Sequence, residues 1–249
     1  MSTLNRAHEA VNTALRPLGV HVERGRAHGE AVKSFIPARR TIAEAKRAGM
    51  SVGDYIDVQY GVPGTTPATV DAMLEIAGLT GPVERVCEVG AGSGRFMTLV
   101  MDRLHPKVYE VYEPADDWTS YLATYPHVVV RPCDGSTLSA TASRSVDLVH
   151  AQKVLVYLEF PTAVSYLQEM VRVVRPGGIV AFDVITERCL SEETVATWVA
   201  EKSLFRPIPR RWVLDFLSAR GMTYLGNYFP AIREGITEFM VFRSTPEQQ

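Results

Sequence analysis

A short stretch that combines one acidic residue with three glycines carries the most specific chemical signal in this sequence. It reads Glu88-Val-Gly-Ala-Gly-Ser-Gly94 and begins at the end of a largely apolar run, residues 85–89. Glycine lets a backbone approach a ligand closely, and a helix that begins after such a turn directs free amide groups toward that ligand. The pattern predicts a site for a nucleotide-like group, although glycine in such a turn also serves packing alone. The residues expected to hold the ligand are Gly90, Ala91, Gly92, Ser93 and Gly94.

The same turn argues against a nicotinamide dinucleotide. The dinucleotide fingerprint GxGxxG, counted from Gly90, requires a third glycine where this chain has Arg95. A carboxylate at Glu88 would also repel a pyrophosphate, whereas it can accept hydrogen bonds from an ammonium group. The sequence therefore favours a nucleoside that carries an amino acid, and a nicotinamide oxidoreductase is the less favoured alternative.

Two further carboxylates are expected near this turn. Glu113 closes the next apolar run, where a carboxylate can accept both hydroxyls of a ribose, and Asp134 follows the run after that, where it can face an adenine amine. Each of them is explained equally well as a helix cap or turn residue. The carboxyl ends of parallel strands meet at one edge of a sheet, so together with Glu88 they predict a single site.

From about residue 82 onward, strands alternate with helices, which is typical of a parallel sheet covered on both faces. Residues 175–178 are expected to form a turn, and residues 51–66, rich in glycine, an ordered loop that could cover a site. The expected strands are 85–89, 108–112, 128–131, 146–150, 179–184, and a last pair near 223–228 and 238–242. The expected helices are 7–15, 30–49, 67–77, 94–104, 116–125, 162–174, 191–202 and 210–219.

Bulk properties narrow the classes of partner. The chain has 249 residues and a formal net charge of −2, so it presents no strong positive field toward nucleic acid or a membrane surface. Cys87, Cys133 and Cys189 form no CxxC pair, which argues against a zinc cluster or a disulfide framework. No signal peptide or membrane anchor is visible. These features predict a cytoplasmic protein with a small-molecule partner; a homodimer stays open.

The region from about 83 to 184 resembles class I S-adenosylmethionine-dependent methyltransferases of the broad type-11-like group. The resemblance rests on five segments: Val86–Gly94, Tyr112–Pro114, Cys133–Gly135, Val146–Gln152 and Val173–Gly178. It implies an α/β, Rossmann-like, seven-stranded and mostly parallel sheet with one antiparallel strand. S-adenosylmethionine would be the cofactor and S-adenosylhomocysteine its product.

The resemblance also implies roles for single residues. Glu88 and the turn at 90–94 would hold the methionine part of the cofactor. Glu113, with Pro114, would hold the ribose, and Asp134, with Gly135, would lie on the adenine side. Residues 1–80 would form an N-terminal helical extension and lid loop, and residues 81–249 the cofactor-binding domain, with acceptor-site insertions at about 186–235.

The residues after the fourth strand are the nearest candidates for the acceptor. His150 is a candidate general base for a hydroxyl acceptor, because its ordinary pKa suits proton transfer near neutral pH; a histidine that only bonds a neighbouring loop is the competing explanation. Lys153 and Tyr157 are further catalytic candidates, and Gln152 and Tyr60 candidate cofactor contacts. An aromatic face such as that of Tyr60 attracts a sulfonium. No carboxylate lies directly after this strand, so magnesium is unsupported, although Asp54, Asp57 or Glu187 could supply metal ligands from elsewhere in the chain.

The acceptor is predicted from weaker signals. Three tryptophans and a tyrosine, Trp118, Trp198, Trp212 and Tyr157, suit an aromatic pocket for a carbohydrate, although core packing also explains them. Residues 207–216 and 61–66 are similar to methyltransferases of polysaccharide pathways, which implies a sugar O-methyltransferase acting on methylated mannose or a related polysaccharide. Methylation of another small molecule at a phenolic oxygen, nitrogen or carbon, and a non-catalytic cofactor-binding module, are the alternatives.

Overall fold

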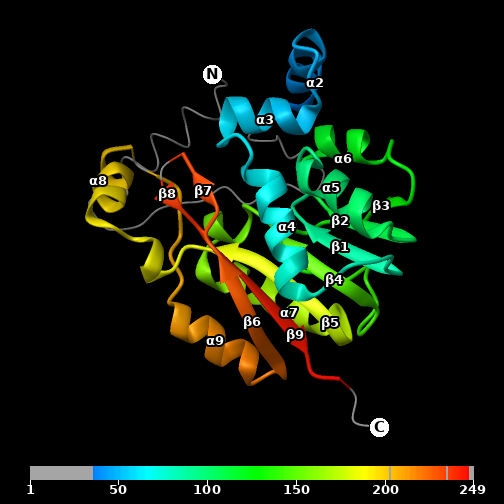
Figure 1. The fold of residues 1–249 in the computed structure, drawn as a ribbon, viewed down its shortest axis with the longest axis vertical. Helices are drawn as coiled ribbons and strands as arrows, with labels where there is room; N and C mark the ends of the chain where they lie inside the picture. Colours follow the sequence, from blue (N-terminus) through cyan, green and yellow to red (C-terminus); the bar gives the residue numbers. More distant parts are fainter. Residues whose placement is uncertain (1–35, 202, 234, 247–249) are drawn as a thin grey trace, which may run out of the picture. The chain divides into compact units, whose positions relative to one another are not determined.

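A seven-stranded sheet forms the centre of the protein, as the sequence predicts (Figure 1). The strand order is β3-β2-β1-β4-β5-β9-β6; the first five strands run parallel, and β9 pairs antiparallel with both β5 and β6. The strands are β1 (Arg85–Val89), β2 (Val108–Tyr112), β3 (Val128–Val130), β4 (Val146–Ala151), β5 (Val174–Val184), β6 (Met222–Tyr228) and β9 (Glu238–Ser244). A separate hairpin consists of β7 (Ala231–Ile232) and β8 (Gly235–Ile236).

The computed structural model describes residues 36–201, 203–233 and 235–246. These residues belong to one of the two units into which the chain divides, the unit of residues 33–249. The predicted helix at 7–15 and the start of the predicted helix at 30–49 lie outside the described residues. None of the helices in the described ranges is both long enough and apolar enough to cross a membrane.

Helices cover both faces of the sheet, so the strands are nearly continuous apolar runs. On one face, α4 and α5 pack against Val86, Leu148 and Ala181; on the other, α7 and α9 pack against Val149 and Phe182. The helices are α2 (Ala38–Arg47), α3 (Val52–Tyr60), α4 (Thr65–Ala77), α5 (Arg95–Leu104), α6 (Asp116–Leu122), α7 (Phe160–Val173), α8 (Glu192–Glu201) and α9 (Arg210–Ser218), with short 3-10 helices at Leu155–Tyr157 and Glu187–Cys189.

The prediction of a loop at 51–66 is wrong in its first part, because residues 52–60 form α3. The Ser51 side chain caps this helix by accepting a hydrogen bond from the Asp54 amide, and Ile56 and Asp57 are buried. Gly53 lies inside the helix because the chain passes close to α5 there: a Cβ at this position would come 3.1 Å from the Cβ of Arg95. The turn-forming residues Gly61 and Gly64 follow the end of α3 and precede α4.

The expected turn at 175–178 is also wrong, because β5 begins at Val174 and continues through it. Gly177 lies within the strand at φ +74°, and the pairing of β5 with β4 shifts register between Val146 and Leu148. A side chain on Gly178 would meet the Asp147 carbonyl at 3.0 Å, so this glycine permits close approach of neighbouring strands.

Candidate cofactor and acceptor site

The glycine turn lies between β1 and α5, at the carboxyl edge of the sheet. Gly90, Gly92 and Gly94 have φ values of +67°, +52° and +73°, so all three use the left-handed conformation that glycine tolerates best. A Cβ on Gly90 would collide with Val154, and one on Gly94 would come 2.9 Å from Leu122. A Cβ on Gly92 would meet no atom within 4 Å among the described residues. Packing therefore explains two of the glycines, whereas Gly92 faces open space that a ligand can enter.

Glu113 lies directly beside this turn. Its Oε2 accepts a hydrogen bond from the Gly92 amide at 2.7 Å, and its Oε1 accepts one from the Ala115 amide at 2.9 Å. Burial raises the pKa of Glu113, and these two amides act in the opposite direction. The residues predicted to hold the methionine part and the ribose of the cofactor thus lie together at the carboxyl edge of the sheet, where Glu113 holds the turn.

Asp134 shapes its own turn. Its Oδ1 accepts hydrogen bonds from the amides of Ser136 and Thr137 at 2.8 and 2.7 Å, and its Oδ2 accepts one from the Thr137 hydroxyl at 2.6 Å. Partial burial works against ionisation, but these hydrogen bonds leave the pKa of Asp134 below its usual value. Asp134 therefore acts as a turn residue without a ligand. Gly135 follows it at φ +81°. Contact of Asp134 with an adenine stays a prediction.

Glu88 belongs to a buried chain of polar side chains on the face covered by α4 and α5. Glu88 Oε2 lies 2.7 Å from the Tyr109 hydroxyl, which lies 2.8 Å from Nε2 of His150. Nδ1 of His150 is 2.8 Å from Oε1 of Gln152, whose amide nitrogen contacts the sulfur of Met73 at 3.8 Å. Burial raises the pKa of Glu88 to about 8 and lowers the pKa of His150 to about 4. Both groups are therefore predominantly neutral near pH 7.

The role of His150 as a base in contact with an acceptor does not fit this arrangement. The side chain is fully buried, and both ring nitrogens have hydrogen-bond partners within the chain. The pairing of Glu88 with His150 across β1 and β4 explains this position, because the two side chains project to the same face of the sheet. The competing explanation, a histidine that only bonds a neighbouring loop, fits in part, since Gln152 follows β4 but Tyr109 lies on β2.

A second polar cluster lies where β4 and β5 end. Lys153 has φ +59°, and its amide donates to Asp183 Oδ1 at 2.7 Å. The Lys153 amine lies 3.5 Å from Asp183 Oδ2 and 3.4 Å from the hydroxyl of Thr237, which donates to the same carboxylate at 3.0 Å. Burial lowers the pKa of Lys153, and the charge of Asp183 opposes this shift. The sequence reasoning missed Asp183 and Thr237; a carboxylate inside the apolar run at 179–184 was the available signal.

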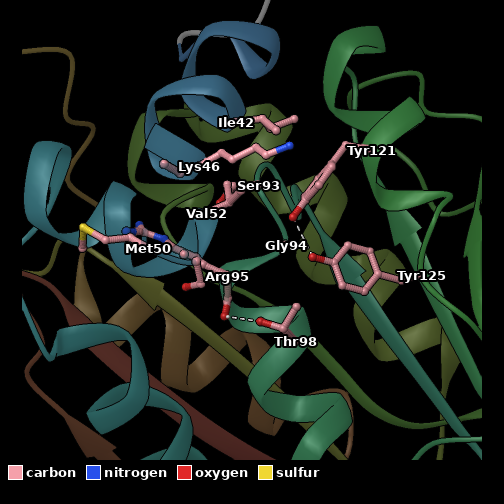
Figure 2. A pocket seen from close by; sticks show the side chains of 13 residues that line it. Ile42, Lys46, Met50, Val52, Ser93, Gly94, Arg95, Thr98, Tyr121 and Tyr125 are labelled. Atoms are coloured by element: carbon pink, nitrogen blue, oxygen red, sulfur yellow. Dashed lines mark hydrogen bonds between the residues drawn. The ribbon is translucent and has the colours of Figure 1, made fainter. Parts of the chain in front are cut away.

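Helices α2 and α3 lie against the outer side of the glycine turn. Between them and α6 is a cavity of about 330 Å³, into whose rim the Lys46 side chain extends toward Tyr121 (Figure 2). Arg95, the first residue of α5, forms a 2.6 Å ion pair with Asp57 of α3, and the same carboxylate accepts from Thr66 at 2.7 Å. This contact joins the N-terminal helices to the turn.

Comparisons with known proteins agree with this architecture. Residues 87–182 match the family model described as a methyltransferase domain. The chain is a class I S-adenosylmethionine-dependent methyltransferase. The matched segment runs from β1 through β5 and so contains the glycine turn, Glu113 and the strand that precedes Lys153.

Solved structures share the fold at low sequence identity. The N-methyltransferase NodS of Bradyrhizobium japonicum WM9, in complex with S-adenosylhomocysteine, is 18% identical; the match covers 83% of this chain and 99% of NodS, with a TM-score of 0.57. Magnesium protoporphyrin IX methyltransferase of Synechocystis PCC 6803 is 11% identical, with 97% and 99% of the two chains covered and a TM-score of 0.56. No curated protein matches the sequence.

The aromatic residues of the methyltransferase do not form one pocket. Trp118 is 3% exposed, packs with Ala38 and Ile56, and donates to the Ile36 carbonyl at 2.8 Å. Trp212 packs between Phe160 and Phe216. Two members of the predicted set share a neighbour: Tyr157 stacks on Phe205 with the ring centroids 5.3 Å apart, and the Trp198 ring centroid lies 4.9 Å from that of the same phenylalanine. The four side chains therefore do not line a common pocket, and core packing, the competing explanation, accounts for Trp118 and Trp212.

Tyr157 and Tyr60 are accessible to solvent, at 49% and 45% of their surfaces. Tyr60 ends α3 and Tyr157 ends the 3-10 helix after β4, so both lie on segments next to the carboxyl edge. Their roles as cofactor contact and catalytic residue stay predictions. Within the described ranges, no group of three or more His, Cys, Asp or Glu side chains is arranged to hold a metal ion.

Proposed function

We propose that this methyltransferase transfers a methyl group to a hydroxyl of a small polar acceptor, with a sugar or oligosaccharide precursor as the substrate class. The observation that carries the proposal is the partly buried Lys153 amine directly after β4, within 3.5 Å of Asp183 and Thr237. A polar cluster of this kind, with 17% of the lysine side chain exposed, favours a hydroxylated acceptor over an apolar one.

The cofactor residues proposed here are those of the glycine turn together with Glu88 and Glu113. Gly92 leaves space at the edge, and Glu113 is placed beside it for the ribose hydroxyls. When bound, S-adenosylmethionine supplies an electrophilic methyl carbon on a cationic sulfur. The turn and Glu113 would fix the direction of the carbon–sulfur bond, which matters because methyl transfer is an in-line displacement that depends on alignment.

Lys153 is proposed as the base in place of His150. Burial lowers the pKa of its amine, which increases the fraction present as the neutral form that accepts a proton. Lys153 would take up the hydroxyl proton of the acceptor, while bound S-adenosylmethionine would supply the methyl group and leave as S-adenosylhomocysteine. Asp183 then stabilises the ammonium that results.

Product mapping with isotopically labelled methyl donor tests the acceptor class. The purified chain is incubated with panels of sugars, phenols and amines, and the labelled atom is identified by mass spectrometry and NMR. We expect label on a sugar hydroxyl. Label only on nitrogen, carbon or a phenolic oxygen refutes the sugar acceptor.

Substitution of Lys153 tests the base. General bases contribute about 10²–10⁴-fold to turnover, so Lys153→Met should lower kcat by that order while binding of S-adenosylhomocysteine is retained. Lys153→Arg should lose a similar factor, because arginine keeps the charge but does not deprotonate. Lys107→Met is the matched control, since Lys107 is 73% exposed in a pair with Glu84 before β2. A kcat equal to that of the wild type in Lys153→Arg would exclude Lys153 as the general base.

A further inference from the structure

The contacts within the polar chain formed by Glu88, Tyr109, His150 and Gln152 determine how many protons this chain holds. Its three contacts, at 2.7, 2.8 and 2.8 Å, are all hydrogen bonds, so each needs one proton between its two heavy atoms. The oxygen of Gln152 only accepts, so the proton of the last contact is on Nδ1 of His150. The first two contacts then need two more protons.

Tyr109 supplies only one of those two protons. Burial raises the pKa of its hydroxyl, so the hydroxyl stays protonated and has one hydrogen to share between Glu88 and His150. The remaining proton is on the Glu88 carboxyl or on Nε2 of His150. An imidazolium and a carboxylate are both costly in a fully buried position, whereas a neutral acid beside a neutral imidazole is not. The proton is therefore at Glu88.

We infer that Glu88 holds a proton in the cofactor-free protein, that binding of the amino-acid part of S-adenosylmethionine releases this proton, and that Tyr109 positions the carboxyl for the exchange. The inference rests on the proposed placement of Glu88 near the methionine part of the cofactor. A cationic ammonium group near Glu88 favours the carboxylate over the acid, and the Tyr109 hydroxyl then turns to donate to that carboxylate.

The surroundings of Glu88 contain few other charges. β2 contributes Tyr109, β4 contributes His150, and α5 contributes Arg95, whose charge favours ionisation. Glu113, after β2, disfavours ionisation. The parts of α4 and α5 that pack on this face are apolar, including Met73, Met97 and Val100. No charge of the described part of the chain forms an ion pair with Glu88, which leaves the position of a cationic partner to the cofactor.

Calorimetry measures the release directly. S-adenosylhomocysteine is titrated into the full chain at pH 7 in two buffers with different ionisation enthalpies, and the difference in observed enthalpy gives the number of protons released. We expect about 0.5–1 proton for the wild type. The probe 5′-methylthioadenosine, which lacks the amino-acid part, should release none. Equal release with both probes, or none with S-adenosylhomocysteine, overturns the inference.

Two variants separate the roles of the residues. Glu88→Gln is neutral at every pH and should bind without proton release; persistent release in this variant overturns the assignment to Glu88. In the wild type, affinity for S-adenosylhomocysteine should rise by up to about tenfold per pH unit between pH 6 and 8, because ionised Glu88 is the binding form.

Tyr109→Phe removes a hydrogen bond to the carboxylate and should move the midpoint of this pH dependence to higher pH. If Tyr109 had a purely structural role, the variant would bind S-adenosylhomocysteine more weakly by the same factor at every pH. That result would contradict the positioning role. Tyr112→Phe is the control: Tyr112 is equally buried on the opposite face of β2 and bonds Thr141, so its midpoint should match the wild type. Failure of S-adenosylhomocysteine to bind at all would instead refute the cofactor site on which the inference rests.

Discussion

The two carboxylate oxygens of Glu113 accept hydrogen bonds from backbone amides, one from Gly92 in the glycine turn and one from Ala115, the residue before α6. A carboxylate in this position holds the glycine turn in place, and the proposed contact with a ribose would use the same side chain. Net stabilisation from hydrogen bonds to charged groups is about 1.5–3 kcal/mol each, so the side chain is a major determinant of the geometry of the turn.

Glu113→Ala should weaken binding of S-adenosylhomocysteine by at least about tenfold, because both amides lose their acceptor and the turn loses its anchor. Glu113→Gln keeps one acceptor oxygen and should lose less. Calorimetry gives the dissociation constants. Glu169→Ala is the control: this carboxylate also accepts from a backbone amide, that of Leu138, but on α7. Equal affinity in Glu113→Ala and the wild type would remove Glu113 from the cofactor site.

The residues differ in how much of their position the sequence reveals. Glu88, Gly92 and Glu113 lie at one edge as predicted, because parallel strands end at the same edge and the residue types at those ends are visible in the sequence. The environment of His150 was not visible, since its partner Tyr109 is 41 residues away on another strand. A strand pattern buried on both faces does not show which neighbour a polar residue will meet.

Helix α3 shows the same limit for a whole element. Its glycine-rich sequence predicted a loop, but the Ser51 cap and the pairing of buried Asp57 with Arg95 provide tertiary stabilisation that local propensity does not contain. Strands β1, β2 and β4 were predictable to within a residue, since their length and apolar character come from burial on both faces, whereas β5 begins well before the predicted strand at 179–184. The pair of Asp57 with Arg95 connects α3 to the glycine turn, so a substitution of Asp57 tests whether this contact holds the helix in place.

Asp57→Ala should loosen α3 while leaving the sheet intact. The side chains of Asp57 and Arg95 are 9% and 18% exposed, so removal of one partner leaves a poorly hydrated charge. Hydrogen exchange followed by mass spectrometry should show faster exchange in residues 52–60, with β1 and β4 unchanged. Asp215→Ala is the control, because its side chain and that of its partner Arg211 are 60% and 85% exposed, so water screens the pair and its loss should leave exchange unchanged. Unchanged exchange in α3 would show that other contacts hold the helix.

Across the whole molecule, the sheet buries two titratable groups whose pKa values move in opposite directions. Burial raises the pKa of Glu88 from 4.5 to about 8 and lowers the pKa of His150 from 6.5 to about 4. The folded protein therefore retains a proton on Glu88 that the unfolded chain releases above its own pKa. It also leaves His150 neutral where the unfolded chain would bind a proton.

The signs of these two contributions determine how stability changes with pH. Stability from Glu88 is fully present below pH 4.5 and is lost as pH rises toward 8, whereas stability from His150 is present above pH 6.5 and is lost as pH falls toward 4. The two slopes oppose each other between pH 4.5 and 6.5. Between pH 6.5 and 8, only the Glu88 contribution changes.

The cofactor-free protein should consequently lose stability between pH 6.5 and 8, with a slope of at most about 1.4 kcal/mol per pH unit from Glu88. Urea unfolding at pH 6.5, 7.2 and 8.0 measures the free energy of unfolding. Glu88→Gln should remove this slope, because the amide resembles the protonated acid in size and charge and has nothing to release. Titration of exposed groups affects both proteins alike, so the difference between them isolates Glu88. Parallel curves for wild type and variant would mean that the folded protein does not keep its proton at Glu88.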